Sequence, residues 1–153
     1  MAMEGRERVL RRLQAIQGAP RKAMRQAIEM GAQQIAASAK NLAPKKTGAL
    51  AASIGYTFGS YKAANANVRG VSAGNGEGDP DLSATVHAGD AKAFYAAFLE
   101  FGVSPHKAGG MFEGAEHPGA QASPFFFPAY RMNKRSVKSR ISRAAKKAIK
   151  DAR

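Results

Sequence analysis

The sequence predicts an α+β fold, a small antiparallel β-sheet packed by a long N-terminal helix, a short middle helix and a basic C-terminal helix. Three observations predict it. Apolar residues recur at steps of three and four before Pro44, they alternate with polar residues in two central segments, and lysine and arginine dominate the end. A chain of 153 residues has the size of one domain. We therefore expect one α+β domain over residues 1–130 and a basic C-terminal helix or tail over residues 131–153.

Two helices are expected before Pro44. The first covers residues 4–17, Gly18 ends it, and its apolar face consists of Val9, Leu10, Leu13 and Ile16. The second starts near Pro20, because proline is tolerated in a first helical turn. It runs to Ala43 along a narrow apolar stripe. Pro44 then stops it, since proline disfavours a helical residue before it and cannot donate a backbone hydrogen bond.

Two strands are expected in the middle of the chain. The segment "ASIGYTF" (52–58) alternates apolar and polar residues, and so does "LSATVHA" (82–88). The stretch 60–82 between them is rich in glycine and asparagine, so we expect a long mobile loop, with at most a weak strand at 67–71.

A short helix is expected after the second strand. Asp90 is a typical N-cap and Gly102 a typical C-terminal residue, and Phe94, Phe98 and Phe101 lie on one side at helical spacing. We expect these three rings to belong to the core. Residues 103–122 are rich in Gly, His and Pro and are expected to be irregular.

The stretch "SPFFFPAYR" (123–131) is expected to be extended, with Pro128 starting the terminal helix. Alternate side chains of an extended run point to opposite faces. Phe125 and Phe127 should then pack inside, while Phe126 faces outward and anchors a neighbouring subunit or partner. The alternative is that all three rings lie in one core.

Candidate chemical sites are weak. There is no cysteine, so disulfides and thiolate sites are excluded. His106 and His117 bracket Glu113 and Glu116 without the spacing of a metal site, and the carboxylates of 74–81 lack the glycine and distal glutamate of an EF-hand. No nucleophile motif is present. We expect no enzyme activity, no metal and no cofactor. The N-terminus lacks a secretory signal and no apolar run is long enough to span a bilayer, so a soluble protein made in a cytoplasm is expected.

Charge is segregated along the chain. Net charge is +7 over residues 1–50, −3 over 51–130 and +9 over 131–153. This pattern favours an anionic partner, either nucleic acid or an acidic protein surface, over a face that only keeps the protein soluble. The residues expected to face an anion or DNA are Lys134, Arg135, Lys138, Arg140, Arg143, Lys146, Lys147 and Lys150. A free nucleic-acid-binding protein that uses its basic termini is therefore one candidate function.

Three stretches in order carry a family resemblance: "APKKTGALAASI" (43–54), "FYAAFLEFG" (94–102) and "PFFFPAYR" (124–131). Together they resemble the head–tail joining and tail-completion family of long-tailed bacteriophages and phage-derived particles, which includes neck and tail-terminator-like proteins. The matching residues are Thr47, Gly48, Leu50, Ser53, Ile54, Tyr95, Ala96, Glu100, Phe101, Gly102, Pro124, Phe125, Pro128 and Ala129.

The resemblance implies a non-enzymatic structural subunit of a virion or phage-like particle, assembled in the host cytoplasm. Such subunits form a ring, commonly of six copies, at the neck or tail terminus. The ring contacts neighbouring neck or tail-tube proteins and lets DNA pass, with no membrane partner. The residues expected at subunit or partner interfaces are Phe126, Tyr130, Phe101, Thr47 and Leu50.

Overall fold

The structure, a computed structural model, describes residues 2–61 and 79–151, without side-chain detail for 2–5 and 11–17. Its elements in chain order are α1 (Ala2–Leu42), α2 (Ala49–Ser53), β1 (Gly55–Phe58), β2 (Ala84–His87), α3 (Ala96–Phe101), β3 (His106–Lys107), the 3-10 turn η1 (Gly110–Phe112), β4 (Glu116–His117) and α4 (Phe126–Asp151). The predicted α+β fold with a long N-terminal helix is confirmed. The weak strand expected at 67–71 and most of the loop expected to be mobile lie outside the described residues.

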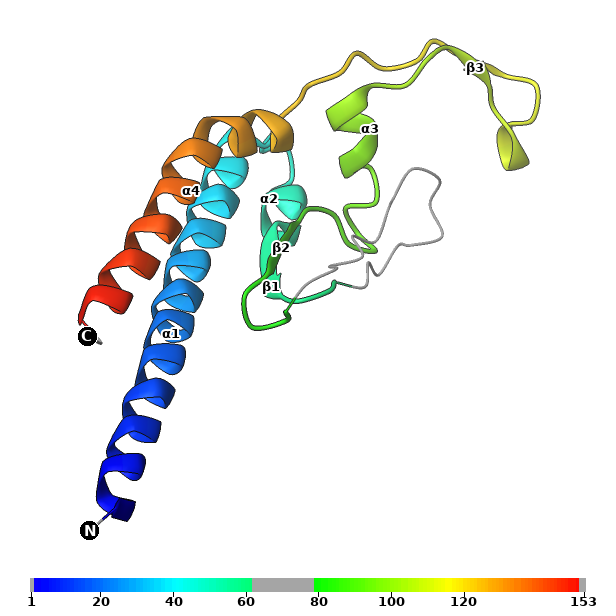
Figure 1. Ribbon diagram of the computed structural model, residues 1–153. Helices are drawn as coiled ribbons and strands as arrows, with labels where there is room; N and C mark the ends of the chain where they lie inside the picture. Colours follow the sequence, from blue (N-terminus) through cyan, green and yellow to red (C-terminus); the bar gives the residue numbers. More distant parts are fainter. Residues whose placement is uncertain (1, 62–78, 152–153) are drawn as a thin grey trace.

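The long helix α1 runs without interruption from Ala2 to Leu42, so the predicted break at Gly18 is wrong (Figure 1). Pro20 lies inside the helix. A proline removes one backbone hydrogen bond and can kink a helix without ending it, and the helix continues past this one. Pro44 does mark the end as predicted, because α1 stops two residues before it.

The last helix α4 lies antiparallel beside α1 (Figure 1). Gly31 allows the two helices to approach closely, because a Cβ atom at this position would lie 2.5 Å from Cγ1 of Val137. Nearby, the buried amide of Asn133 donates to the Ser38 hydroxyl at 2.9 Å and accepts from Gln34 at 2.7 Å. The pair is therefore held by close small-residue packing and by a polar network that spans both helices.

The strands β1 and β2 form a two-stranded antiparallel sheet, in which Gly55 pairs with His87 and Phe58 with Ala84. The predicted strands exist but are shorter than expected, and the first starts later because residues 49–53 form the helix α2. Gly48 precedes that helix at φ 76°, a conformation in which glycine is strongly favoured.

The sheet is held against α1 by polar contacts. Tyr56 donates its hydroxyl hydrogen to Glu29 at 3.2 Å and accepts from Gln33 at 2.9 Å. The Arg25 guanidinium lies 4.3 Å from the centre of the Phe58 ring.

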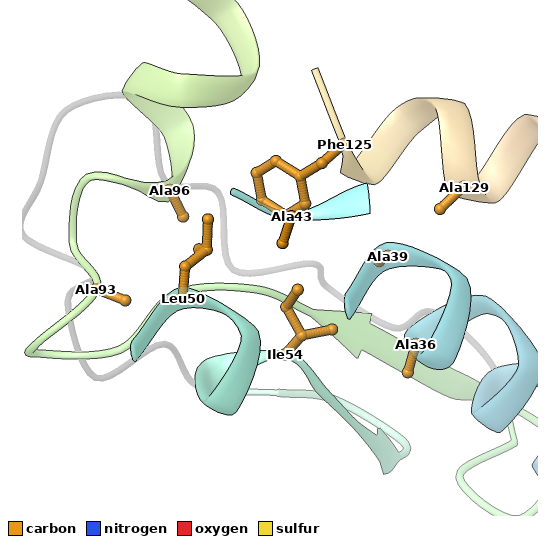
Figure 2. Packing of buried hydrophobic residues seen from close by; sticks show 9 residues of the cluster. All are labelled: Ala36, Ala39, Ala43, Leu50, Ile54, Ala93, Ala96, Phe125 and Ala129. Carbon is orange, nitrogen blue, oxygen red and sulfur yellow. The ribbon is translucent and has the colours of Figure 1, made fainter. Parts of the chain in front are cut away.

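The core is small and consists mainly of alanine (Figure 2). Its members lie in α1, α2, α3 and α4 or within a few residues of their ends: Ala36, Ala39, Ala43, Leu50, Ile54, Ala93, Ala96, Phe125 and Ala129. Phe125, Leu50 and Ile54 are its largest fully buried side chains. We call the meeting point of these elements the junction.

The three phenylalanines do not form a strand, so the predicted extended conformation is wrong. The helix α4 begins at Phe126, and helical rather than alternating spacing decides which rings face the core. Phe125 is buried as predicted, with Ala129 on the same face. Phe127, predicted inside, is 43% exposed, and Phe126, predicted outside, is half-buried against the core.

Candidate interaction surfaces

A buried carboxylate fixes the start of α4. Glu100 on α3 is 8% exposed, and its Oε2 accepts the backbone N–H groups of Phe125 and Phe126 at 2.8 Å each. Its Oε1 accepts the N–H of Phe127 at 2.9 Å. The first N–H groups of a helix lack partners within the helix, and a negative charge at this end is favourable. Glu100 therefore caps α4 from a neighbouring element and fixes α3 relative to it.

The helix α3 presents its phenylalanines to solvent. Phe94, Phe98 and Phe101 are between 40% and 66% exposed, so the prediction that they form core is wrong. The inner side of this segment is occupied by Ala93, Ala96 and Glu100 instead. The core against which α3 packs is shallow, and small side chains are enough to fill it. The Phe101 ring lies 5.8 Å from the Phe127 ring of α4. We call Phe94, Phe98, Phe101 and Phe127 the aromatic face.

Residues 103–122 form a projecting arm that extends past α3, away from the body of the molecule (Figure 1). At its root, Val103 and Ala120 exchange two backbone hydrogen bonds of 2.9 Å. Further out, β3 pairs with β4 and the rings of His106 and His117 stack 4.9 Å apart.

The arm ends in two apolar side chains at η1: Met111 is 96% exposed and Phe112 is 72% exposed. We call these two residues the tip. Residues 103–122, expected to be irregular, thus contain a short hairpin with an apolar end.

Glycine makes the root of the arm possible. Gly119 has φ 83°, and a Cβ atom there would lie 2.4 Å from the Val103 carbonyl oxygen. Gly102 has φ 74°, and a Cβ atom there would lie 2.9 Å from the Ala120 carbonyl oxygen. Both positions combine a positive φ with a close backbone approach, so larger residues would separate the two strands of the root.

No group of three or more His, Cys, Asp and Glu residues suited to a metal ion occurs in the described part of the chain. At the histidine pair, Nδ1 of His106 lies 2.9 Å from the Ser104 carbonyl oxygen, and Nδ1 of His117 accepts from the Gly119 N–H at 3.0 Å. The acidic stretch 74–81 is described only from 79 onward. There Asp79 is ion-paired with Arg21 on α1, and Asp81 with Arg25.

His87 on β2 is the titratable group with a clear shift among the described side chains. Burial lowers its pKa below the usual 6.5, and the Ser53 backbone partly offsets this. Its ring stacks on Tyr61 at 3.8 Å. Nδ1 of His87 has no hydrogen-bond partner among the described residues. The arrangement therefore favours the neutral imidazole.

The basic residues expected to face an anion lie on α4, and seven of the eight are exposed. Arg140 is the exception, because it is half-buried and donates to Oε1 of Gln34 on α1 at 2.8 Å. Arg140 therefore belongs to the polar network between the two helices.

Beside this network a groove of about 420 Å³ opens between α1 and α4. Its lining residues are Met24, Ile35, Tyr130, Lys134, Val137, Lys138, Ile141, Ser142 and Ala145. We call it the helix groove.

The residues expected at interfaces do not form one surface. Tyr130 and Phe101 are exposed, Tyr130 at the helix groove and Phe101 in the aromatic face. Thr47 is exposed just before α2, where its hydroxyl accepts the Ala49 N–H at 3.4 Å. Leu50 is only 1% exposed and packs in the core of its own subunit. Sequence reasoning missed both the capping role of Glu100 and the arm. The only signal for them was the position of Glu100 in the second motif and the two glycines of the root.

No helix in the described ranges is long and apolar enough to cross a membrane. In the comparisons with known proteins, one family matches residues 7–102, more than half of the chain. This is the HK97-gp10-like family, described as "Bacteriophage HK97-gp10, putative tail-component". The matched stretch includes most of α1, the first sheet, α3 and Glu100, and it stops before the arm and α4. No curated protein and no solved structure matches the chain.

Proposed function

This chain belongs to the HK97-gp10-like family of bacteriophage tail components, and from that membership we propose that it is the subunit of a ring at the neck or tail terminus of a phage-like particle. In this role the ring joins head to tail, contacts neck or tail-tube proteins and lets DNA pass. Six copies are the expected number, assembled in the host cytoplasm.

The observation that supports self-association is the position of the large apolar side chains. The aromatic face and the tip leave phenylalanine and methionine side chains exposed, while alanines fill most of the core. Exposed apolar patches of this kind often mark interaction sites. They lie on different parts of the subunit, as a head-to-tail contact requires, and such contacts close into rings when the rotation allows.

The exposed lysines and arginines of α4 support a role for DNA. A basic surface on this helix would contact phosphates without sequence preference, and that contact would weaken steeply with salt. In the ring, we propose that the basic side chains of α4 outside the helix groove, among them Arg143, Lys146, Lys147 and Lys150, face the passing DNA. The second candidate function, a free nucleic-acid-binding protein, uses the same side chains without assembly.

Light scattering of the purified protein with and without duplex DNA tests the proposal. A ring subunit should show a mass several-fold above the 16.2 kDa of one chain, and negative-stain images should show closed rings. A free binder should instead remain a monomer or dimer and shift DNA with a steep salt dependence.

Lys146→Glu combined with Lys150→Glu separates the two functions. The charge reversals should abolish DNA binding in either case and leave ring assembly intact. If the wild-type protein stays monomeric and its DNA binding disappears in this variant, the ring is excluded in favour of the free binder.

A further inference from the structure

We propose that the arm of one copy docks into the helix groove of the next copy, with the tip on the apolar floor and the arm carboxylates beside the lysine rim. The inference rests on the proposed ring and names the two surfaces that would form its repeating contact. It assigns a receptor to the arm, whose strands β3 and β4 contact chiefly each other among the described residues.

The helix groove combines an apolar floor with a basic rim. Its floor includes Ile35, which is 7% exposed, and the half-buried side chains of Val137 and Ile141. Lys134 and Lys138 are exposed at its edge. An occupant that fits should bring apolar side chains for the floor and negative charge for the rim.

The arm carries this combination. Met111 is the most exposed large apolar side chain described, Phe112 is as exposed as Met132 on α4, and Glu113 follows the tip directly. Glu116 lies nearby on β4 and is also exposed. Two apolar residues followed by carboxylates complement two lysines above an apolar floor. The aromatic face is also apolar, but the phenylalanines that define it offer no cation to the carboxylates.

The geometry makes the contact intermolecular. In Figure 1 the arm extends beyond α3, on the side of the molecule away from α4. Met111 lies nine positions after Gly102, and nine residues in extended form span up to about 30 Å. The arm can therefore reach a neighbouring copy. Each copy would give an arm and receive one, so the contact is heterologous and propagates around a ring.

Cysteine cross-linking tests the contact directly, because the natural chain contains no cysteine. One sample carries Met111→Cys at the tip and another carries Ser142→Cys, an exposed position in the lining of the helix groove. Mixed under mild oxidation, the two should give a disulfide-linked heterodimer in several-fold higher yield than Met111→Cys mixed with Ser136→Cys, an exposed position of α4 outside the groove lining. A disulfide requires Cα atoms within about 7 Å, so random encounters contribute little.

Exchanging the charges of the two surfaces provides a second test. Glu113→Lys in the tip sample should reduce the cross-link, and Lys138→Glu in the groove sample should restore it. Equal yields at Ser142 and Ser136, or a cross-link indifferent to both charges, would overturn the docking. Light scattering of the wild-type protein tests ring formation separately. A closed ring without the cross-link refutes only the docking, whereas a cross-link in open chains refutes only the ring.

Discussion

The junction and the arm differ in the burial and the hydrogen bonding of their side chains. At the junction, Phe125 and Leu50 are fully buried and the Glu100 carboxylate accepts three backbone hydrogen bonds. Along the arm nearly every side chain from 104 to 118 is exposed, and backbone pairing holds the two strands together. The larger hydrophobic side chains are thus divided between a part that stabilises the subunit and a part that contributes little to its stability.

The comparison shows that the exposure of large apolar residues follows a pattern, in which they cover the outer side of α3 and the tip of the arm. Alanine fills the inner side of α3, and phenylalanine covers its outer side. A subunit that is stable alone would normally use the larger side chains in its core, because burial of each contributes about 1.5–3 kcal/mol. We infer that junction residues determine stability, whereas residues of the arm and the aromatic face determine association.

The largest effect on stability is expected at Phe125. Phe125→Ala should lower the free energy of unfolding by about 3–5 kcal/mol, because it leaves a cavity at the centre of the core. The matched control is Phe127→Ala, which removes a ring that is 43% exposed and should lower it by about 1 kcal/mol or less. Urea denaturation measures both. Equal losses would mean that both rings lie in the core, as the sequence predicted.

The next effect concerns the cap of α4. Glu100→Ala leaves three backbone N–H groups without their acceptor and should lower the free energy of unfolding by about 2–3 kcal/mol. Glu116→Ala removes an exposed carboxylate of the arm and should change it by no more than about 0.5 kcal/mol. Thermal melts followed by circular dichroism provide the comparison. If the two variants melt alike, the cap does not stabilise the junction.

A smaller effect is expected between α1 and α4. Gly31→Ala forces a methyl group against Val137 and should destabilise the protein by about 1–3 kcal/mol. In a Val137→Ala background the same change should become favourable by up to about 1 kcal/mol, because alanine is the better helix former. A double-mutant cycle in urea measures the coupling. An unchanged effect of Gly31→Ala in the two backgrounds would exclude the close approach.

A pH dependence is expected from His87. Its pKa is lower in the folded state than in the unfolded state, so the unfolded state binds more protons once the pH falls below about 6.5. Stability should therefore be fully present above that pH and decrease as the pH falls below it. Urea titrations at several pH values follow this slope, and His87→Gln should flatten it. A slope that survives this substitution must come from other groups.

A small effect on stability is expected at the aromatic face. Phe98→Ser should lower the free energy of unfolding of the monomer by about 1 kcal/mol or less, since the ring is 40% exposed and faces solvent. If this face serves assembly, the same change should weaken association by about 2 kcal/mol. Melting curves and light scattering on one preparation separate the two. A variant that fails to fold would place Phe98 in the core after all.

Local pattern was enough to predict much of the fold. The 3.6-residue period of α1 and the alternation around Tyr56 and Val86 identified a long helix and the two strands of the first sheet. Pro20 misled the prediction, because its local penalty does not decide whether a long helix continues. The aromatic side of α3 also misled it, because the depth of the core beneath a helix is a property of the whole fold.

The candidate site was less predictable. The cap by Glu100 joins residues 25 to 27 positions apart, and nothing in the spacing of a single sequence reveals such a pair. Tyr130 and the α4 lysines were singled out for their type, but the groove that they line exists only once α1 lies beside α4. The arm depends on Gly102 and Gly119, whose positive φ values are recognised only in the folded chain.

The cap by Glu100 also has a mechanical consequence. The arm starts three residues after Glu100, and the chain that returns from it is tied to α3 where the Ser123 N–H donates to the Leu99 carbonyl at 2.7 Å. A force on the tip would therefore pass through the hydrogen-bonded root to α3, and the three hydrogen bonds of Glu100 would share it with the first turn of α4. In an assembly that holds the tip, we expect the position of the basic helix to depend on the position of the tip through this one carboxylate.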